Sequence, residues 1–527
     1  MGPRIIPEAH VEPEGAAGAA RARRRVGTRW YAHRALVAPS REATLLDTFV
    51  AIDLETTGLN PSQDRITEIG MVRFGLPGAT AVTKPETFDS FVNPDIPIPV
   101  RIQQITGISD ADVADALHFN ALRLEEYRGW ESIGEFLAEF DRAAAQNVIG
   151  QVPYANVRSL VCGFGKQWVD DLQMKMIQTE VHRGMQEGAV GISTGLDYIV
   201  QCYTTTDELV EACKVIAEYD GVYTTHVRYK KGILDGIREA VEIGKRSGCR
   251  VHISHVKGRD EQTVEALLSL FDEVSKEVEF SYECYPYQPG STMLNYLLPY
   301  EAWDDGPLGA MSRLHDPTVR AHFRQALESY PLNLDRMTLA WVPGKENTVF
   351  QGQTLDQYVE QMGLPVEEAL YSLLIEERLA PLIVFNEGED RQIEPLLQHE
   401  RCVIGSDGIY HDGGTVHPRV YGTAPRIIGS CVRDRKLFSL EEAVAKLTSK
   451  SADVYGLKDR GRVVEGGLAD LVVFDADTVA DRATYENPHQ TADGIDLVVV
   501  NGEVILETGQ PVEFDGPMPG RSLRYER

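Results

Sequence analysis

The sequence predicts an α/β protein built mainly of an incomplete TIM-like (β/α) barrel of about six strands, with a β-rich region before it and a small β element after it. From residue 132 onward, short apolar segments alternate with amphipathic stretches of helical length, which is typical of a parallel α/β fold. Six segments have the length and flanks of strands, whereas a closed barrel needs about eight. They lie at 148–151, 189–194, 221–226, 250–255, 278–283 and 402–407.

The regions on either side have a different pattern. Residues 1–45 are rich in Ala, Arg, Gly and Pro, with a basic cluster at 21–25, and we expect a disordered tail there, with a nucleic-acid-binding arm as the alternative. Strands are predicted at 48–54, 64–74 and 86–92, and a final β element at 469–474 and 497–506, around the turn Asn501-Gly502. The expected domains are therefore 1–45, 46–117, 118–467 and 468–527.

Composition restricts the function classes. With 527 residues, two or three domains are expected. The net charge of -28 makes tight nucleic-acid binding by the whole chain unfavourable, and no stretch approaches the roughly 20 apolar residues of a membrane span. The seven cysteines are scattered and never form a C-x-x-C pair, which favours a reducing cytoplasm over a disulfide framework. Nothing in the sequence predicts the oligomeric state.

Three residues with metal-binding side chains end predicted barrel strands. His226, His255 and Asp407 each stand at the carboxyl end of a strand, the face on which such barrels carry their active sites. Two imidazoles and a carboxylate suit a catalytic zinc, and Asp407 could also accept the proton of the attacking water. The alternative is that each histidine is a hydrogen-bonded core residue. His252 is excluded, because strand alternation should point it to the face opposite His255.

Successive motifs across this region resemble one known family. They are GAVGISTGLDY (188–198), THVR (225–228), ISHVK (253–257), YPY (285–287), GSDG (405–408), HPRVYGTAPR (417–426), DRG (459–461), ADLVVFD (469–475) and VNG (500–502). From about residue 118 to the end, the chain resembles the N-acyl-D-amino-acid deacylases (D-aminoacylases) of the amidohydrolase superfamily. The resemblance implies hydrolysis of a C–N amide bond in an N-acyl amino acid or related small molecule.

The resemblance also implies roles for single residues. It makes His226 and His255 zinc ligands and Asp407 the catalytic acid/base and a further metal-binding group. The implied substrate-binding residues are Tyr198, Lys257, Tyr285, Tyr287 and Arg419. Lys257, two residues beyond a strand-end histidine, is also well placed to bind an anion, although an ordinary surface lysine would look the same.

The chain departs from this family at its start. The family begins with half of a β-sandwich, a strand ending in His-x-His, and a strand that supplies a cysteine ligand. No His-x-His occurs in the 527 residues, and Cys162 lies in the wrong segment to replace that cysteine. We therefore expect weaker metal binding and an exposed sheet edge.

A second resemblance takes the place of the missing strands. FVAIDLETTG (49–58), ITEIG (66–70), FVNP (91–94) and ITGI (105–108) resemble the start of a DnaQ-like 3'-5' exonuclease, which implies a ribonuclease H-like fragment. Asp53 and Glu55, two apart on a strand, could share Mg²⁺ or Mn²⁺. Two-metal cleavage needs further carboxylates, and no segment matches the motifs that supply them.

Three hypotheses follow from these observations. The first is a zinc-dependent deacylase that uses His226, His255 and Asp407. The second is an exonuclease that uses Asp53 and Glu55. The third is an inactive fusion product, in which two incomplete domains are joined near residue 118.

Overall fold

The chain divides into two compact units, Met1–Glu126 and Tyr127–Arg527. The computed structural model describes the backbone at 31–33, 48–56, 66–75 and 86–91, and the residues 131–329, 333–386, 388–411 and 413–524. The expected boundary between 117 and 118 lies outside the described residues.

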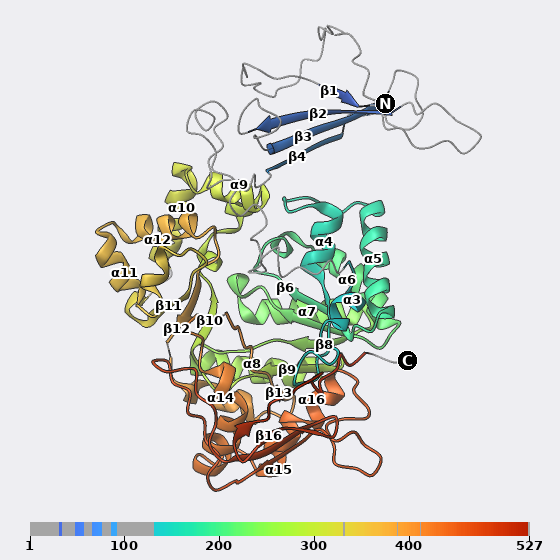
Figure 1. Cartoon of the computed structure of the whole chain (residues 1–527), viewed down its shortest axis with the longest axis vertical. Coiled ribbons are helices and arrows are strands. Elements are labelled where there is room, and N and C mark those ends of the chain that lie inside the picture. The colour runs from blue at the N-terminus through green and yellow to red at the C-terminus, as the bar shows by residue number, and fades with distance from the viewer. Residues whose placement is uncertain are drawn as a thin grey trace, which may run out of the picture. The chain divides into compact units, whose positions relative to one another are not determined.

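The described part of the first unit is an antiparallel sheet in the order β1-β2-β3-β4 (Figure 1). Its strands are β1 (Tyr31–His33), β2 (Thr48–Thr56), β3 (Ile66–Gly75) and β4 (Glu86–Phe91). The three strands predicted from the sequence are confirmed. The expectation of a disordered tail over 1–45 falls mostly outside the described residues; within this range the structure describes β1, which pairs with β2 as an edge strand.

The second unit is organised around a six-stranded parallel sheet in the order β13-β9-β8-β7-β6-β5. The strands are β5 (Val152–Pro153), β6 (Gly191–Gly195), β7 (Val222–His226), β8 (Arg250–Ile253), β9 (Phe280–Cys284) and β13 (Cys402–Ile404). The predicted number of six is confirmed, although the first strand lies just beyond the expected 148–151. Within the described residues β5 and β13 do not pair, so the sheet keeps two edges.

Helices cover one face of this sheet. They are α4 (Tyr154–Cys162), α5 (Asp171–Gln186), α6 (Thr206–Ala217), α7 (Ile233–Ser247) and α8 (Glu261–Val274). Asp170 caps the first turn of α5 and Thr205 that of α6, which satisfies amide groups that have no partner inside the helix. Val251 and Ile253 of β8 pack with these helices in the main hydrophobic core. The other face of the sheet carries polar side chains that lie in register, Thr224 of β7, His252 of β8 and Ser281 of β9.

A helical lobe interrupts the barrel pattern and was not predicted. Its sheet has the antiparallel order β10-β12-β11, formed by β10 (Gly290–Met293), β11 (Met337–Trp341) and β12 (Leu382–Phe385). Four helices pack with it: α9 (Gly306–Arg313), α10 (Pro317–Ser329), α11 (Leu355–Met362) and α12 (Val366–Glu376). This lobe has its own hydrophobic core and lies beside the parallel sheet (Figure 1).

Helices and a second sheet complete the unit. The remaining helices are α3 (Ile133–Ala138), α13 (Glu394–Gln398), α14 (Arg419–Arg426), the π-helix η9 (Ile427–Asp434), α15 (Leu440–Leu447) and α16 (Ser449–Val454). The predicted C-terminal β element is confirmed as the antiparallel sheet of β14 (Leu471–Phe474), β15 (Ile495–Val500), β16 (Glu503–Glu507) and β17 (Gln510–Pro511).

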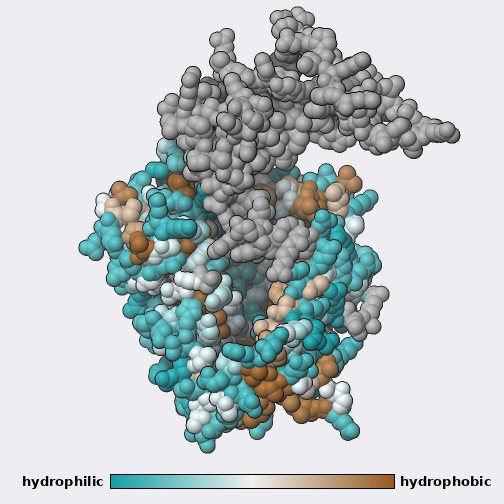
Figure 2. Space-filling view, viewed as in Figure 1, coloured by the Kyte–Doolittle hydropathy of each residue, from teal (hydrophilic) through white to brown (hydrophobic). Residues whose placement is uncertain are grey.

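Two features of the surface follow from this arrangement. Apolar side chains of the C-terminal sheet, among them Val472, Val473 and Val504, are exposed, and apolar patches are visible on the surface in Figure 2. Among the helices that the structure describes, none combines the length and apolar character needed to cross a membrane.

Candidate functional site

Two histidines meet at the carboxyl ends of adjacent strands. His226 is the last residue of β7, and His255 follows the end of β8 by two residues. Nδ1 of His226 lies 3.2 Å from Nε2 of His255. His255 has a φ of 40°, a conformation that a non-glycine residue adopts only when its surroundings hold it there, and such residues cluster at functional sites. The sequence-based expectation that these two imidazoles converge therefore agrees with the geometry.

His252 lies on the same face of the sheet as His226. It pairs in register with Thr224 of β7, and its Nδ1 lies 2.8 Å from the hydroxyl of Ser281. The prediction that His252 points away from the histidine pair is wrong, because β8 has ended before His255 and strand alternation no longer applies there. His252 is instead fully buried and lies within β8, farther from the carboxyl end of the sheet than His255.

Asp407 is bound to an arginine. β13 ends three residues before Asp407, whose φ is 47°, and its carboxylate lies 2.8 Å from the fully buried guanidinium of Arg419. Burial raises the pKa of Asp407, and the positive charge of Arg419 opposes that rise. Across the described residues, no group of three or more His, Cys, Asp or Glu side chains is arranged to hold a metal ion. The expected three-residue ligand set is therefore present only as the histidine pair.

The histidine pair fits two positions of a zinc site. Zinc–nitrogen bonds of about 2.0 Å in a tetrahedral arrangement separate two ligand nitrogens by about 3.3 Å. The nitrogens of His226 and His255 are 3.2 Å apart. Burial, followed by the neighbouring His226 ring and the charge of Arg419, holds the pKa of His255 well below its ordinary value, which keeps this imidazole in the neutral form that a metal requires. The described side chains thus supply two ligands and no third.

Tyr198 stands against the first histidine. It follows β6, its ring centroid lies 4.9 Å from that of His226, and its hydroxyl lies 2.7 Å from the hydroxyl of Thr292 in β10. Burial raises the pKa of Tyr198 to about 12, so the hydroxyl keeps its proton near neutral pH. This neutral group can donate a hydrogen bond to a bound molecule.

Two cations lie over one tyrosine ring. Nζ of Lys257 is 4.2 Å and the guanidinium carbon of Arg419 4.5 Å from the ring centroid of Tyr285. Lys257 donates to the backbone carbonyls of Gln288 and Pro289. Burial and the charge of Arg419 lower the pKa of Lys257 well below its ordinary value. The guanidinium of Arg419 stays charged, and a bound anion would favour the protonated form of Lys257, so the two side chains together form a place where an anion is electrostatically favoured.

Tyr287, the second tyrosine of the YPY turn, has other partners. Its hydroxyl donates to Asp481 at 3.3 Å, and the guanidinium of Arg426 lies 4.4 Å from its ring centroid. These contacts tie the turn to the C-terminal segment. Tyr285 and Tyr287 were expected together at the substrate, but only Tyr285 contacts the Lys257 and Arg419 side chains in this way.

Sequence reasoning missed Asp197 and the residues that surround it. The carboxylate of Asp197 is fully buried and lies 3.3 Å from Nε2 of His226. Burial would raise its pKa, but hydrogen bonds from His226 and Tyr300 bring the pKa below its ordinary value. Its place next to Tyr198 in the GAVGISTGLDY motif was the only available signal.

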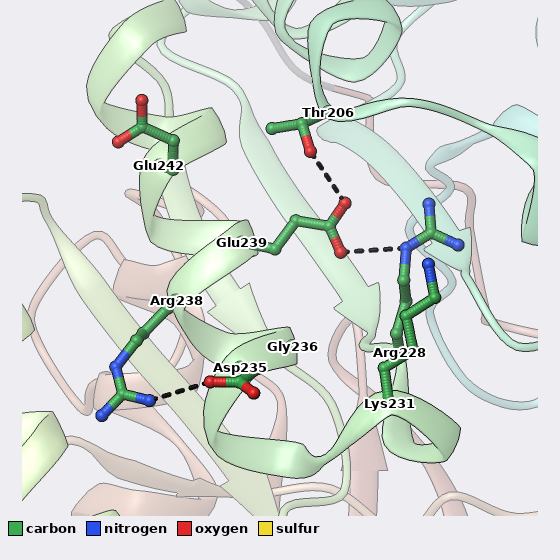
Figure 3. A pocket seen from close by; sticks show the side chains of 8 residues that line it. All are labelled: Thr206, Arg228, Lys231, Asp235, Gly236, Arg238, Glu239 and Glu242. Atoms are coloured by element: carbon green, nitrogen blue, oxygen red, sulfur yellow. Dashed lines mark hydrogen bonds and ion pairs between the residues drawn. The ribbon is translucent and has the colours of Figure 1, made fainter.

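A cleft of about 520 Å³ lies on the helix-covered side, where α7 begins (Figure 3). It is lined by Thr206, Arg228, Lys231, Asp235, Gly236, Arg238, Glu239 and Glu242. The buried guanidinium of Arg228 bonds Glu239 and the backbone carbonyls of Leu196, Cys202 and Thr204. These bonds occupy the donors of Arg228 and hold the loop after His226 against residues 196–204, so we assign the cleft a structural role.

The exonuclease-like positions lie in the first unit. Asp53 and Glu55 both belong to β2, where their backbone partners in β3 are Gly70 and Glu68. Their side chains lie outside the described part of the chain.

Comparison with known proteins agrees with both resemblances. The model of the Amidohydrolase family matches residues 392–506, and the Exonuclease model matches residues 50–149. A D-aminoacylase of Alcaligenes xylosoxydans xylosoxydans is 32% identical over 388 residues, which cover 72% of this chain and 70% of the relative. A PolC-type DNA polymerase III of Caldanaerobacter subterraneus subsp. tengcongensis is 43% identical over 81 residues, 15% of this chain and 5% of the relative.

A solved structure extends the comparison to the fold. The N-acyl-D-glutamate deacylase from Bordetella bronchiseptica, complexed with zinc and a phosphonate inhibitor that mimics the tetrahedral intermediate, is 28% identical. The match covers 72% of each chain with a TM-score of 0.60.

Proposed function

Because the chain belongs to the D-aminoacylase family of amidohydrolases, we propose that it hydrolyses the amide bond of an N-acyl-D-amino acid or a related amide with a zinc ion held by His226 and His255. The observation that carries this proposal is the pair of imidazole nitrogens 3.2 Å apart at the carboxyl ends of β7 and β8. A zinc ion bound there would polarise the amide carbonyl and lower the pKa of a bound water.

The side chains around the pair suit the rest of the reaction. Asp407, with a pKa raised by burial, would take the proton of the attacking water and deliver it to the leaving nitrogen. Its bond to Arg419 fixes the orientation of the carboxylate. Among the side chains that the structure describes, two imidazoles are available at this site, so zinc should bind more weakly than at a site with three protein ligands.

The substrate carboxylate would occupy the cationic place formed by Lys257 and Arg419. Both side chains are held over the ring of Tyr285, which limits their motion. Arg419 can meet a carboxylate with parallel N–H groups, whereas Lys257 acts as a point charge. Tyr198, whose hydroxyl keeps its proton, would donate a hydrogen bond to the scissile carbonyl. The small amide is thus bound through its acid group and hydrolysed at the histidine pair.

The state of the cysteines supports a proposal for the compartment. All seven are buried free thiols. Free thiols are favoured where glutathione and thioredoxin keep cysteine reduced, so we place the protein in the cytoplasm.

The test of the proposal is a hydrolysis assay on the full chain. Metal-stripped and zinc-reconstituted protein would be incubated with N-acetyl-D-amino acids and their L enantiomers, and the released amine measured. We expect turnover that requires zinc and prefers the D form. The matched variants are His226→Gln, which should abolish turnover, and the exposed Asp235→Asn, which should keep it. The absence of turnover with zinc would reject the proposal and favour an inactive fusion product.

The match of residues 50–149 to the Exonuclease family favours a second candidate activity. Asp53 and Glu55 would hold Mg²⁺ or Mn²⁺ for 3'-5' cleavage of a nucleic-acid strand. The test is digestion of end-labelled single-stranded DNA with either ion. Loss of digestion in Asp53→Asn supports this candidate, and undigested DNA with the unchanged chain rejects it.

A further inference from the structure

Asp197 is a buried carboxylate that contacts His226 on the side of the ring away from His255. It lies in the loop after β6, between the motif glycines and Tyr198. Its Oδ2 is 3.3 Å from Nε2 of His226, on the opposite side of the ring from the nitrogen that faces His255. The side chain of Asp197 has no exposed area. An isolated charge in such a place is unfavourable unless hydrogen bonds satisfy it.

Both oxygens of Asp197 accept hydrogen bonds. The hydroxyl of Tyr300 donates to Oδ1. The hydroxyl of Tyr296 and the backbone N–H of Lys230 donate to Oδ2, each at 3.3 Å. The tyrosines belong to the 3-10 helices η4 (Leu294–Leu297) and η5 (Tyr300–Trp303). An ionised carboxylate surrounded by donors can only accept, so the nearby nitrogen of His226 must carry a proton.

This contact determines the tautomer of His226. A neutral imidazole carries one proton, and when Nε2 carries it, Nδ1 has the lone pair. Nδ1 is the nitrogen that faces Nε2 of His255 at 3.2 Å. Metal-binding histidines commonly donate their second N–H to a carboxylate, which fixes both the ring orientation and the tautomer.

We infer that Asp197 is a positioning residue, which fixes the proton of His226 on Nε2 and thereby presents Nδ1 as a ligand toward the position it shares with His255. The inference rests on the zinc-dependent function proposed above. Because Tyr296 and Tyr300 come from the segment that follows β10, this contact also couples the histidine pair to the helical lobe. Removal of the carboxylate that accepts the second N–H of a metal-binding histidine lowers metal affinity by about 10–100-fold.

The test compares variants of the full chain by two measurements. The variants are Asp197→Asn, Asp197→Glu and Tyr300→Phe, with Asp235→Asn as the matched control, since Asp235 is exposed and forms an ion pair with Arg238 on the surface of α7. Zinc affinity is measured by competition with a chromophoric chelator. The tautomer of His226 is measured in the metal-free protein by ¹⁵N NMR of labelled histidine, with the signal assigned from His226→Gln.

The inference predicts a protonated Nε2 in the unchanged chain. Asp197→Asn should reduce the Nε2-protonated fraction and weaken zinc binding by about 10–100-fold. Asp197→Glu, which keeps a carboxylate acceptor, should retain a higher zinc affinity than Asp197→Asn. The zinc affinity of Tyr300→Phe should lie between those of Asp197→Asn and the unchanged chain. The zinc affinity of Asp235→Asn should equal that of the unchanged chain.

Asp197→Asn with an unchanged tautomer and unchanged zinc affinity would overturn the inference. If the unchanged chain binds no zinc, the proposed function fails, and the tautomer of the metal-free protein alone then decides the role of Asp197.

Discussion

Replacing either partner of the Asp407–Arg419 pair should destabilise the protein strongly. The guanidinium of Arg419 is fully buried and lies 2.8 Å from the carboxylate of Asp407. At this distance, with an effective dielectric constant of about 20, the attraction is about 6 kcal/mol before desolvation is subtracted. Asp407→Asn leaves the guanidinium without its counter-charge, although its hydrogen bonds to the Tyr285 hydroxyl and the Ser291 carbonyl remain. We expect either Asp407→Asn or Arg419→Met to cost about 3–5 kcal/mol of unfolding free energy.

The measurement is a double-mutant cycle, in which urea unfolding of the full chain is monitored by tryptophan fluorescence. The double variant Asp407→Asn/Arg419→Met should lose about 2–3 kcal/mol less than the sum of the single losses, because neither charge is then left alone. Single losses that add to within about 0.5 kcal/mol would refute the pairing, and would indicate that Asp407 interacts mainly with other groups.

Three further predictions concern the fold around the site. Burial, followed by the charge of Arg419, holds the pKa of His417 well below its ordinary value, so below about pH 6.5 the unfolded chain binds more protons than the folded one. The free energy of unfolding should therefore fall as the pH falls through this value. In thermal melting, the melting temperature of His417→Gln should decrease less between pH 7.5 and 5 than that of the unchanged chain. Gly191→Ala would place its Cβ 1.9 Å from the carbonyl oxygen of Val222 across the β6–β7 pair, which should cost about 3 kcal/mol or more in urea unfolding; a loss under 1 kcal/mol would contradict this packing. Glu208→Gln should lower the free energy of unfolding by about 3–5 kcal/mol, because it leaves the buried guanidinium of Arg158 without its counter-charge. Glu211→Gln on the same helix, where the side chain is 42% exposed, should change the free energy of unfolding little.

The sequence predicted the parallel sheet because each strand is a short apolar run with polar or glycine flanks. It did not predict the lobe of β10, β11 and β12, since these antiparallel strands lie far apart along the chain and helices separate them. The apolar run at Leu382–Phe385 was the available signal, but its partner strands at Gly290–Met293 and Met337–Trp341 could not be identified from pattern alone.

The candidate site could be predicted only as far as strand geometry applies. His226 ends a strand, so strand alternation places its side chain on the same face as that of Thr224. His255 and Asp407 lie beyond their strands with positive φ angles, and their side-chain directions depend on loop conformations that no periodicity specifies. The contact of Asp197 with His226 joins a loop to the end of a strand 29 residues later, and it could not be predicted from either segment alone.

The most direct test of a metal at the histidine pair is anomalous diffraction at the zinc absorption edge from zinc-soaked crystals of the full chain. A zinc ion held by the histidine pair would give a single strong anomalous peak about 2.0–2.1 Å from both Nδ1 of His226 and Nε2 of His255. A peak at other residues, or no peak between these two nitrogens at saturating zinc, would contradict it.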